Sequence, residues 1–176
     1  PPLPPGKWSA IDSIRVEAAC KVLLTFSSPP WAAAALAKRP LHSIICAECE
    51  VPELWFKQKR TGEWIVSGFA TGDLAASLCA RPNDKAVEAL LQQLAEVLPH
   101  VFAAEGSNTA QPELLARLRA SLIDAHVVDW AAEPWALGGY SCPAFGEAAE
   151  ARSVYRASCE LLCFCGEATE DSCMTM

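Results

Sequence analysis

The sequence predicts an α+β fold in which a mixed β-sheet is flanked by helices. Three observations lead to this class. Apolar and polar residues alternate over much of residues 14–69, which is typical of strands. Apolar residues then recur at helical spacing over residues 86–122, and a strand-like run returns at residues 125–130. Strands that precede helices and one returning strand are expected to form a single sheet with helices packed on it.

The first half of the chain is expected to supply most of the sheet. The proline-rich residues 1–8 are predicted to be extended. A strand follows over residues 14–26 and ends at a Ser-Ser-Pro-Pro segment, after which residues 31–38 form a short alanine-rich turn or helix. Three further strands, the last two joined by a hairpin turn at Thr61-Gly62, are predicted at residues 41–46, 53–57 and 63–69.

The second half is expected to supply the helices. Asn83-Asp84 is a favourable N-cap for a helix that Pro99 is expected to end. A second helix has Pro112 in its first turn and one leucine stripe that consists of Leu114, Leu115, Leu118 and Leu122. After it, the sequence predicts a strand at residues 125–130, a loop at 133–147, a short helix at 148–156 and a final strand at 160–165.

Composition narrows the classes of protein that the chain can belong to. The 176 residues are enough for one domain with two small lobes, and the apolar fraction of 52% is that of a folded chain. A net charge of −7 argues against nucleic-acid binding, because phosphate neutralisation requires clustered Lys and Arg. No apolar run approaches the roughly 18 residues of a membrane span. Nine irregularly spaced cysteines favour reduced thiols and therefore an intracellular, cytoplasmic protein.

The motifs of common metal and nucleotide sites are weak or missing. Cys46 and Cys49 form an isolated CxxC, and Cys163 and Cys165 form a CxC, whereas a structural zinc site needs four ligands. We interpret these cysteines as small buried hydrophobic residues, with a metal or redox role as the alternative. The glycines form neither a GxGxxG nor a P-loop, and no GxSxG is present, so the chain by itself has no dinucleotide-binding fingerprint.

Two features could carry chemistry. Lys21 lies within an apolar strand, where it either extends its ammonium group to water or holds a water or a reacting group in an apolar site. Residues 129–141 contain Trp130, Trp135 and Tyr140 beside a Gly-Gly pair. This segment is either an aromatic staple under a loop or an aromatic wall for a flat cofactor or an amine.

Five segments, in order along nearly the whole chain, resemble the flavin-containing amine oxidases, which include polyamine oxidases, monoamine oxidases and histone lysine demethylases. The family pattern W-x-x-(D/E)-P-W-x-x-G-x-Y-S reads WAAEPWALGGYS here, and L-x-F-x-G-E-x-T reads LCFCGEAT. The initial PPLP and the KVLLTF strand that leads to Trp31 also match, as does WIVSGFATG, which closes at Gly72. Together the five segments are specific.

The resemblance implies a division of the chain by function. Residues 1–135 are similar to the family's substrate-binding lobe, and residues 136–176 are similar to an incomplete C-terminal FAD-binding segment. Met174 to Met176 resemble the beginning of a stretch that leads, in the family, to a helix facing the flavin. The N-terminal Rossmann-type domain is absent, so the missing FAD-binding domain of the same protein is the implied partner. A truncated gene product and a natural short protein both remain open.

The resemblance also assigns roles to individual residues. Lys21 matches the lysine that holds a water at flavin N5, and Tyr140 matches one wall of the aromatic cage that admits an amine, so these two are the implied catalytic residues. FAD is the implied cofactor and no metal is implied. The positions that match flavin contacts are Trp135, Gly139, Tyr140, Gly166, Glu167, Thr175 and Met176.

Family members oxidise a C–N bond of an amine and pass the electrons to O₂, which gives an imine or aldehyde and H₂O₂. A polyamine-like amine and O₂ are therefore the implied small-molecule partners, whereas nucleic acid and membrane are not expected. Methyl-lysine, monoamines and amino acids stay open as substrates, as does a related role in porphyrinogen or carotenoid oxidation. Without a GxGxxG domain, the chain alone is expected to be inactive. The alternative is a non-catalytic remnant lobe that acts as a binding or interaction module.

Overall fold

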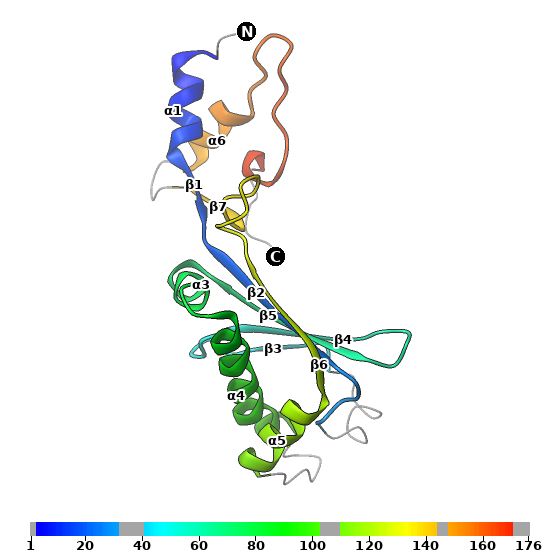
Figure 1. Ribbon diagram of the computed structural model, residues 1–176. Helices are drawn as coiled ribbons and strands as arrows, with labels where there is room; N and C mark the ends of the chain where they lie inside the picture. The colour runs from blue at the N-terminus through cyan, green and yellow to red at the C-terminus, as the bar shows by residue number, and fades with distance from the viewer. Residues whose placement is uncertain (1–2, 32–40, 103–109, 144–147, 171–176) are drawn as a thin grey trace. The chain divides into compact units, whose positions relative to one another are not determined.

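The computed structural model describes residues 3–31, 41–102, 110–143 and 148–170, and these form two compact units (Figure 1). Residues 19–130 form one unit, called the sheet unit below. Residues 1–18 and 131–176 form the other, called the terminal unit because it joins both ends of the chain. The expected division after residue 135 is one of function and stays a prediction, while the boundary between the compact units falls after Trp130.

The sheet unit is built on an antiparallel sheet with the strand order β3–β4–β5–β2–β6 (Figure 1). The α+β class is confirmed, although every pairing in the described part of this sheet is antiparallel where a mixed sheet was expected. Gly62 has a φ of 98° in the predicted hairpin turn between β4 and β5, a conformation that glycine adopts without strain. In chain order the strands are β2 (Ala19–Phe26), β3 (Ser43–Ile45), β4 (Glu53–Gln58), β5 (Trp64–Thr71) and β6 (Leu122–Asp129).

Three helices of the sheet unit lie along one face of this sheet (Figure 1). They are α3 (Gly72–Cys79), α4 (Asn83–Phe102) and α5 (Gln111–Ser121). Strand β2 buries alternate residues, because Val22, Leu24 and Phe26 are below 2% exposed. Gly68, which pairs with Val22, has so little space on this side that a Cβ would approach a Leu90 methyl group of α4 to 2.9 Å. The core therefore lies between this face and α4.

Helix α4 differs from the prediction at its C-terminal end. Pro99 was expected to end it, but the helix continues to Phe102. A proline in a helix removes one backbone hydrogen bond. The loss is tolerated here because Leu98 is fully buried and Phe102 is only 5% exposed, so apolar packing on both sides of the proline holds the last turn in place. Helix α3, which was not predicted from the sequence, begins at Gly72, directly after the end of β5.

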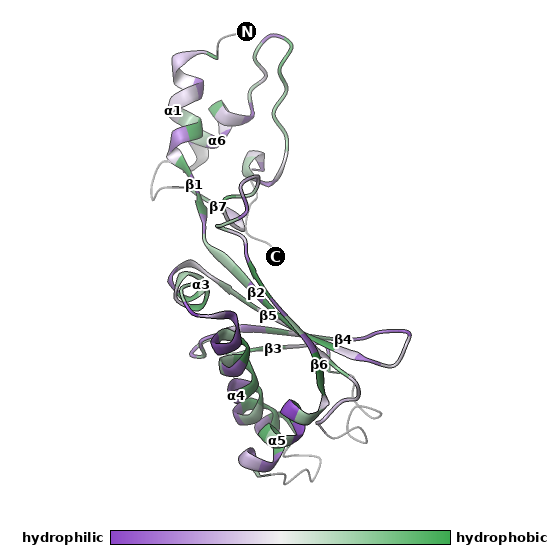
Figure 2. Ribbon diagram, viewed as in Figure 1, coloured by the Kyte–Doolittle hydropathy of each residue, from purple (hydrophilic) through white to green (hydrophobic). Residues whose placement is uncertain are grey.

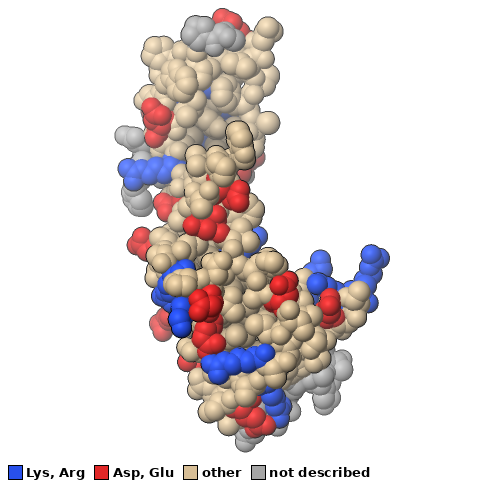
Figure 3. All heavy atoms as spheres, in the orientation of Figure 1, with Lys and Arg blue, Asp and Glu red and all other residues tan. Residues whose placement is uncertain are grey.

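The terminal unit combines two helices with a short two-stranded ribbon. Helices α1 (Pro5–Ser13) and α6 (Ala148–Arg156) pack on each other, and β1 (Ile14–Glu17) pairs with β7 (Tyr140–Pro143) in antiparallel register. A 3₁₀ turn, η2, spans Glu167–Thr169. On the face drawn in Figure 3 this unit is mostly uncharged, whereas Lys, Arg, Asp and Glu are interspersed over the sheet unit.

Lys7 connects the two helices of the terminal unit. It is only 2% exposed, and its Nζ donates hydrogen bonds to the carbonyls of Val154 at 2.8 Å, Tyr155 and Ala157, where α6 ends. The same Nζ lies 3.8 Å from the centroid of the Phe164 ring. The last carbonyls of a helix lack donors within the helix, so the Lys7 ammonium supplies donors to groups that would otherwise be unpaired.

Three further predictions need correction. Residues 5–8 are helical rather than extended, because Pro5 occupies the first helical position, where its missing N–H and fixed φ suit a helix start. The strand expected over residues 14–26 is two strands, since β1 pairs with β7 and β2 pairs with β5 and β6. Residues 160–165 form no strand, and only Leu162 among them takes part in an isolated bridge, with Cys159. Most of the expected turn or helix at 31–38 lies outside the described residues.

The apolar residues follow the strands and the inner side of the helices (Figure 2). Hydrophobic colour dominates β2 and β5, while α4 alternates between hydrophobic and hydrophilic residues along its length. In the described part of the chain, no helix combines the length and the apolar character that crossing a membrane would require.

Candidate functional site

The aromatic loop of the terminal unit is fixed against β1 by its two glycines. Gly139 N donates a hydrogen bond to the carbonyl of Glu17 at 2.9 Å. Gly138 has a φ of 148°, and a Cβ there would lie 2.3 Å from that same carbonyl oxygen and 2.7 Å from Val16 Cγ1. No side chain could occupy this position without moving the backbone. The Gly-Gly pair therefore allows a close approach of two chain segments.

The same turn presents Trp135 to the outside. The amides of Ala136 and Leu137 both donate to the carbonyl of Glu133, which closes a tight turn around the tryptophan. Trp135 is 98% exposed and Leu137 is 64% exposed. A large aromatic side chain held on a structured turn without packing is unusual for a surface, since exposed apolar residues of this size commonly mark a binding surface.

Glu167 is held close to the start of β7. Its carboxylate accepts hydrogen bonds from the backbone N of Ser141 at 3.0 Å and from the Ser141 hydroxyl at 2.7 Å. The buried guanidinium of Arg152, on α6, donates to the same hydroxyl oxygen at 3.2 Å and to the carbonyl of Glu170. Glu167, Ser141 and Arg152 therefore fix the turn η2 relative to β7 and α6.

Three of the predicted site residues are brought together by this network. Gly139 and Tyr140 lead directly into Ser141, and Glu167 binds Ser141 from a position 26 residues later in the chain. Gly166, next to Glu167, has a φ of 117°, and a Cβ built on it would meet no atom within 4 Å. Its backbone is thus open to an approaching group. Thr175 and Met176 lie outside the described residues.

Lys21 belongs to the sheet unit and lies on the central strand β2. Its neighbours across the sheet are Phe69 on β5 and Val128 on β6. The side chain is half-buried, and its Nζ lies 5.5 Å from the centroid of the Phe69 ring. Lys21 points to the sheet face opposite to Val22, so it lies away from the core that α4 covers.

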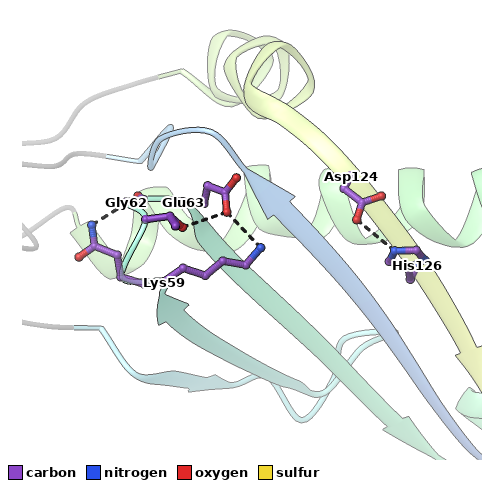
Figure 4. A network of polar contacts seen from close by, with 7 residues as sticks. Lys59, Gly62, Glu63, Asp124 and His126 are labelled. Carbon is purple, nitrogen blue, oxygen red and sulfur yellow. Dashed lines mark hydrogen bonds and ion pairs between the residues drawn. The ribbon is translucent and has the colours of Figure 1, made fainter.

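An Asp-His pair on this sheet face was missed by the sequence analysis. Asp124 and His126 lie two residues apart on β6, and the His126 Nε2 is 3.0 Å from an Asp124 carboxylate oxygen (Figure 4). Because His126 pairs with Leu23 and Lys21 is two residues away on β2, the pair and Lys21 share one face. The sequence carried only part of this signal, because the predicted strand at residues 125–130 contained His126 but began one residue after Asp124; the observed strand starts at Leu122, which places both side chains on one side.

The remaining contacts in Figure 4 belong to the hairpin tip between β4 and β5. Glu63 is bound there by Lys59 at 3.1 Å and by the Thr61 hydroxyl at 3.2 Å, and these hydrogen bonds and the Lys59 charge lower the pKa of Glu63. The carboxylate is solvent-accessible, so this cluster stabilises the turn locally. Within the described ranges, no group of three or more His, Cys, Asp or Glu residues is placed to hold a metal ion.

Comparison with known proteins identifies the family. A family model for flavin containing amine oxidoreductases matches residues 1–174, which is nearly the full chain. The chain belongs to the flavin-containing amine oxidoreductase family. The family assignment inferred from the five sequence segments is therefore confirmed. A search of the curated proteins found no match.

Solved structures of amine oxidases share the fold. Cyclohexylamine oxidase from Brevibacterium oxydans IH-35A matches with a TM-score of 0.72 and 19% identity, over 95% of this chain and 33% of that chain. Wild-type putrescine oxidase bound to putrescine matches with a TM-score of 0.67 and 17% identity, over 89% of this chain and 31% of that chain. This amine oxidoreductase chain thus spans about a third of the length of the oxidases that it matches.

Two features of the terminal unit suit a planar cofactor such as a flavin. Trp135 offers an uncovered aromatic face, and flat ring systems stack well on such faces. Gly166 offers a backbone with positive φ and open space in front of it, which would let a planar group come close to the main chain. These two features lie in the same compact unit and on the two segments that the sequence analysis assigned to flavin contact.

Proposed function

We propose that this chain is the substrate-binding lobe and part of the C-terminal flavin-binding segment of an FAD-dependent amine oxidase. The oxidase would convert a polyamine-like amine and O₂ to an imine or aldehyde and H₂O₂. The observation that carries the proposal is the near-complete exposure of Trp135 on a glycine-fixed turn, in a chain of the amine oxidoreductase family. Bound FAD would supply the acceptor for the two electrons that leave the C–N bond.

In this proposal the terminal unit binds the flavin through its loops. Trp135 would pack against the ring system, and the open backbone at Gly166 would lie close to it. Glu167 would act through Ser141, because its carboxylate is already engaged there and keeps the Gly166 turn in place. Tyr140, which follows Gly139, would offer an aromatic face to the amine and help to exclude water.

The sheet unit would contribute Lys21. Its ammonium group is half-buried beside the Phe69 ring, and an ammonium in such surroundings donates strong hydrogen bonds to a water or a reacting group. A positive charge also disfavours a second cation nearby, so Lys21 would favour the neutral form of the amine. The proposal of an amine substrate rests on the family and on the aromatic residues. The compartment proposed for the enzyme is the cytoplasm.

The rest of the oxidase would be supplied by a Rossmann-type FAD-binding domain of the same protein, so the 176-residue chain alone is proposed to be inactive. The test is an absorption spectrum after incubation with FAD and gel filtration, on this chain and on the longer product of the gene in parallel. Flavin bands and peroxide release with amines in the longer product alone are expected. Flavin bands in neither would contradict the proposal.

Matched variants of the longer product sharpen this test. Trp135→Ala is expected to weaken FAD binding, because it removes the stacking face, whereas Trp8→Ala, which alters another exposed tryptophan of the terminal unit, is not. Lys21→Met is expected to lower kcat/KM for amines by about 100-fold while FAD remains bound. Lys57→Met is its control, since Lys57 is an exposed lysine on the same sheet. Equal effects of Lys21→Met and Lys57→Met would refute the role of Lys21.

A non-catalytic binding module is the second candidate. It is favoured by the same exposed apolar side chains, Trp135, Leu137 and Leu161, the last of which is 95% exposed. Exposed apolar side chains of this size suit a protein partner as well as a cofactor. Absence of flavin in the longer product, together with a concentration-dependent association that Trp135→Ala abolishes, would support this alternative.

A further inference from the structure

The CxxC segment of the sheet unit forms a tight turn. Cys46 N donates to the carbonyl of Pro52 at 2.7 Å, directly after β3 ends, and Cys49 N donates back to the carbonyl of Cys46 at 2.9 Å. A four-residue turn of this kind brings its first and last Cα atoms within about 7 Å. Disulfides join cysteines whose Cα atoms are about 4.4–6.8 Å apart. The backbone has therefore already brought Cys46 and Cys49 to bridging distance.

The turn is held in place from its C-terminal side. The side-chain amide of Gln93, on α4, accepts a hydrogen bond from Val51 N at 3.0 Å and donates one to Val51 O at 2.7 Å. Glu50 forms an ion pair with Arg81. Because Val51 is only 1% exposed, the segment that follows Cys49 is anchored in the core and the turn does not depend on its cysteines for its shape.

The turn is also accessible. The interpretation of the CxxC and CxC cysteines as buried residues was wrong, because Cys46 and Cys49 are partly exposed and Cys163 and Cys165 are exposed. Cys49 borders a cavity of about 570 Å³ together with Lys85, Arg81 and Gln92. Small polar reagents can thus reach its sulfur. The other close pair of thiols, Cys20 and Cys79, differs because Cys20 is buried to 1% exposure.

We propose that Cys46 and Cys49 are a dithiol that hydrogen peroxide oxidises to a reversible disulfide across this turn. The Cys49 thiol first loses its proton, and the thiolate attacks one oxygen of hydrogen peroxide. An S–O bond forms, the O–O bond breaks, and the hydroxide that leaves combines with the released proton to give water. The Cys46 sulfur then displaces this oxygen, an S–S bond forms, and the Cys46 proton ends in water. Two thiols and one peroxide therefore give one disulfide and two waters.

The order of these two steps follows from the surroundings of Cys46. Burial raises the pKa of Cys46 above its ordinary value, and the adjacent Cys49 thiol raises it further. Cys49 borders the cavity and Cys46 does not, so peroxide reaches Cys49 first and Cys46 acts second, as the resolving thiol. The site does not depend on the proposed oxidase activity, although hydrogen peroxide is the product that such an activity would release.

Peptide mapping tests the proposal on the 176-residue chain. Trypsin leaves both cysteines, and no third one, in a single peptide of residues 39–57, so the disulfide appears as the loss of two hydrogen masses from that peptide. After limited peroxide treatment and alkylation, this loss is expected to be nearly complete and to be reversed by dithiothreitol. The peptide of residues 16–21, which carries Cys20, is expected to remain a free thiol.

Variants and unfolding distinguish the turn from a general reactivity of thiols. Cys46→Ser is expected to abolish the disulfide and to leave Cys49 in higher oxidation states, whereas Cys142→Ser, at an exposed cysteine of the terminal unit, is expected to change nothing in the 39–57 peptide. The disulfide is expected to form several-fold faster in the native chain than in urea. An equal rate in urea, or overoxidation without a disulfide in the native chain, would overturn the proposal.

Discussion

Replacing Lys7 by Met tests whether one buried ammonium group holds the terminal unit together. Lys7 is 2% exposed and donates to three carbonyls at the end of α6, those of Val154, Tyr155 and Ala157. Met retains most of the volume and apolar length of the side chain, so the change removes mainly the donors and the charge. We expect the terminal unit to lose stability while the sheet unit does not.

The magnitude follows from the groups that lose their partner. Each of the three carbonyls loses a charged donor at a part-buried site, which costs about 1 kcal/mol, and this gives roughly 3 kcal/mol for the set. The loss of the cation at the helix C-terminus and of its contact with the Phe164 ring, 3.8 Å away, adds to this. The variant also no longer has to bury a charged ammonium group, and this gain offsets the loss of the helix-end and ring contacts.

Native-state hydrogen exchange is the suitable measurement, because it reports each unit separately. A destabilisation of about 3 kcal/mol should accelerate exchange of the α6 amides by roughly 100-fold, while α4 amides stay unchanged. Lys85→Met is the control, since Lys85 is an exposed lysine whose ammonium is 4.0 Å from Asp84, and its effect should stay within about 0.5 kcal/mol. If Lys7→Met accelerated α6 exchange no more than Lys85→Met does, the reasoning would be wrong.

Three further predictions follow from local contacts. Gly138→Ala should destabilise the aromatic loop by about 1–3 kcal/mol, because φ is 148° at this position and the Glu17 carbonyl oxygen would lie 2.3 Å from the new Cβ. Unchanged hydrogen exchange of the loop amides would contradict this. Gly68→Ala should lower the stability of the sheet unit by about 1–3 kcal/mol, since its Cβ would lie 2.9 Å from a Leu90 methyl group, and urea unfolding measures this. Burial, helped by neighbouring groups, raises the pKa of Cys79 from 9.0 to about 12. The unfolded chain therefore releases this proton at lower pH, so stability should fall as pH rises from about 9 to 12, and a Cys79→Ser variant should lose that slope.

The parts of the fold that depend on local patterns could be predicted from the sequence. Helix α5 has Pro112 in its first turn and buries Leu114 and Leu118 as expected, and the hairpin turn at Gly62 forms where a glycine was needed. Sequence order alone could not show that Ala18 separates two strands with different partners. That break depends on which segments pair, and β7, the partner of β1, lies more than 120 residues away.

The predictions that were wrong concern features that depend on burial and on contacts between distant parts of the chain. Pro99 does not end α4, because the buried Leu98 and Phe102 outweigh the lost hydrogen bond. Residues 160–165 have the composition of a strand but find no neighbouring strand among the described residues. A lysine at position 7 also gave no sign of being buried, since its partners lie about 150 residues later in the chain.

The candidate site shows the same distinction. The Gly-Gly pair could be recognised in a short stretch of sequence, whereas the sequence left open whether Trp135 packs under the loop or faces outward, and the structure has it 98% exposed. The network of Ser141, Arg152 and Glu167 could not, because it joins a strand, a helix and a 3₁₀ turn by side-chain hydrogen bonds. Lys21 was found as a lysine in an apolar strand, and its neighbour across the sheet, Phe69, became visible only with the strand register.

In the sheet unit, the Gln93 side chain pairs with the backbone of Val51 in the way that a residue of a neighbouring strand would. Its side-chain amide carries one acceptor and one donor, as a peptide group does, and both are used by Val51. A turn of α4 by one residue, about 100°, would carry this amide away and leave two buried backbone groups unpaired. A single polar residue thus selects one orientation among the similar packings that a leucine-rich helix allows. Substitutions among Leu, Ile and Met on α4 should therefore change how tightly the helix packs rather than which side it turns to the sheet, as long as Gln93 remains.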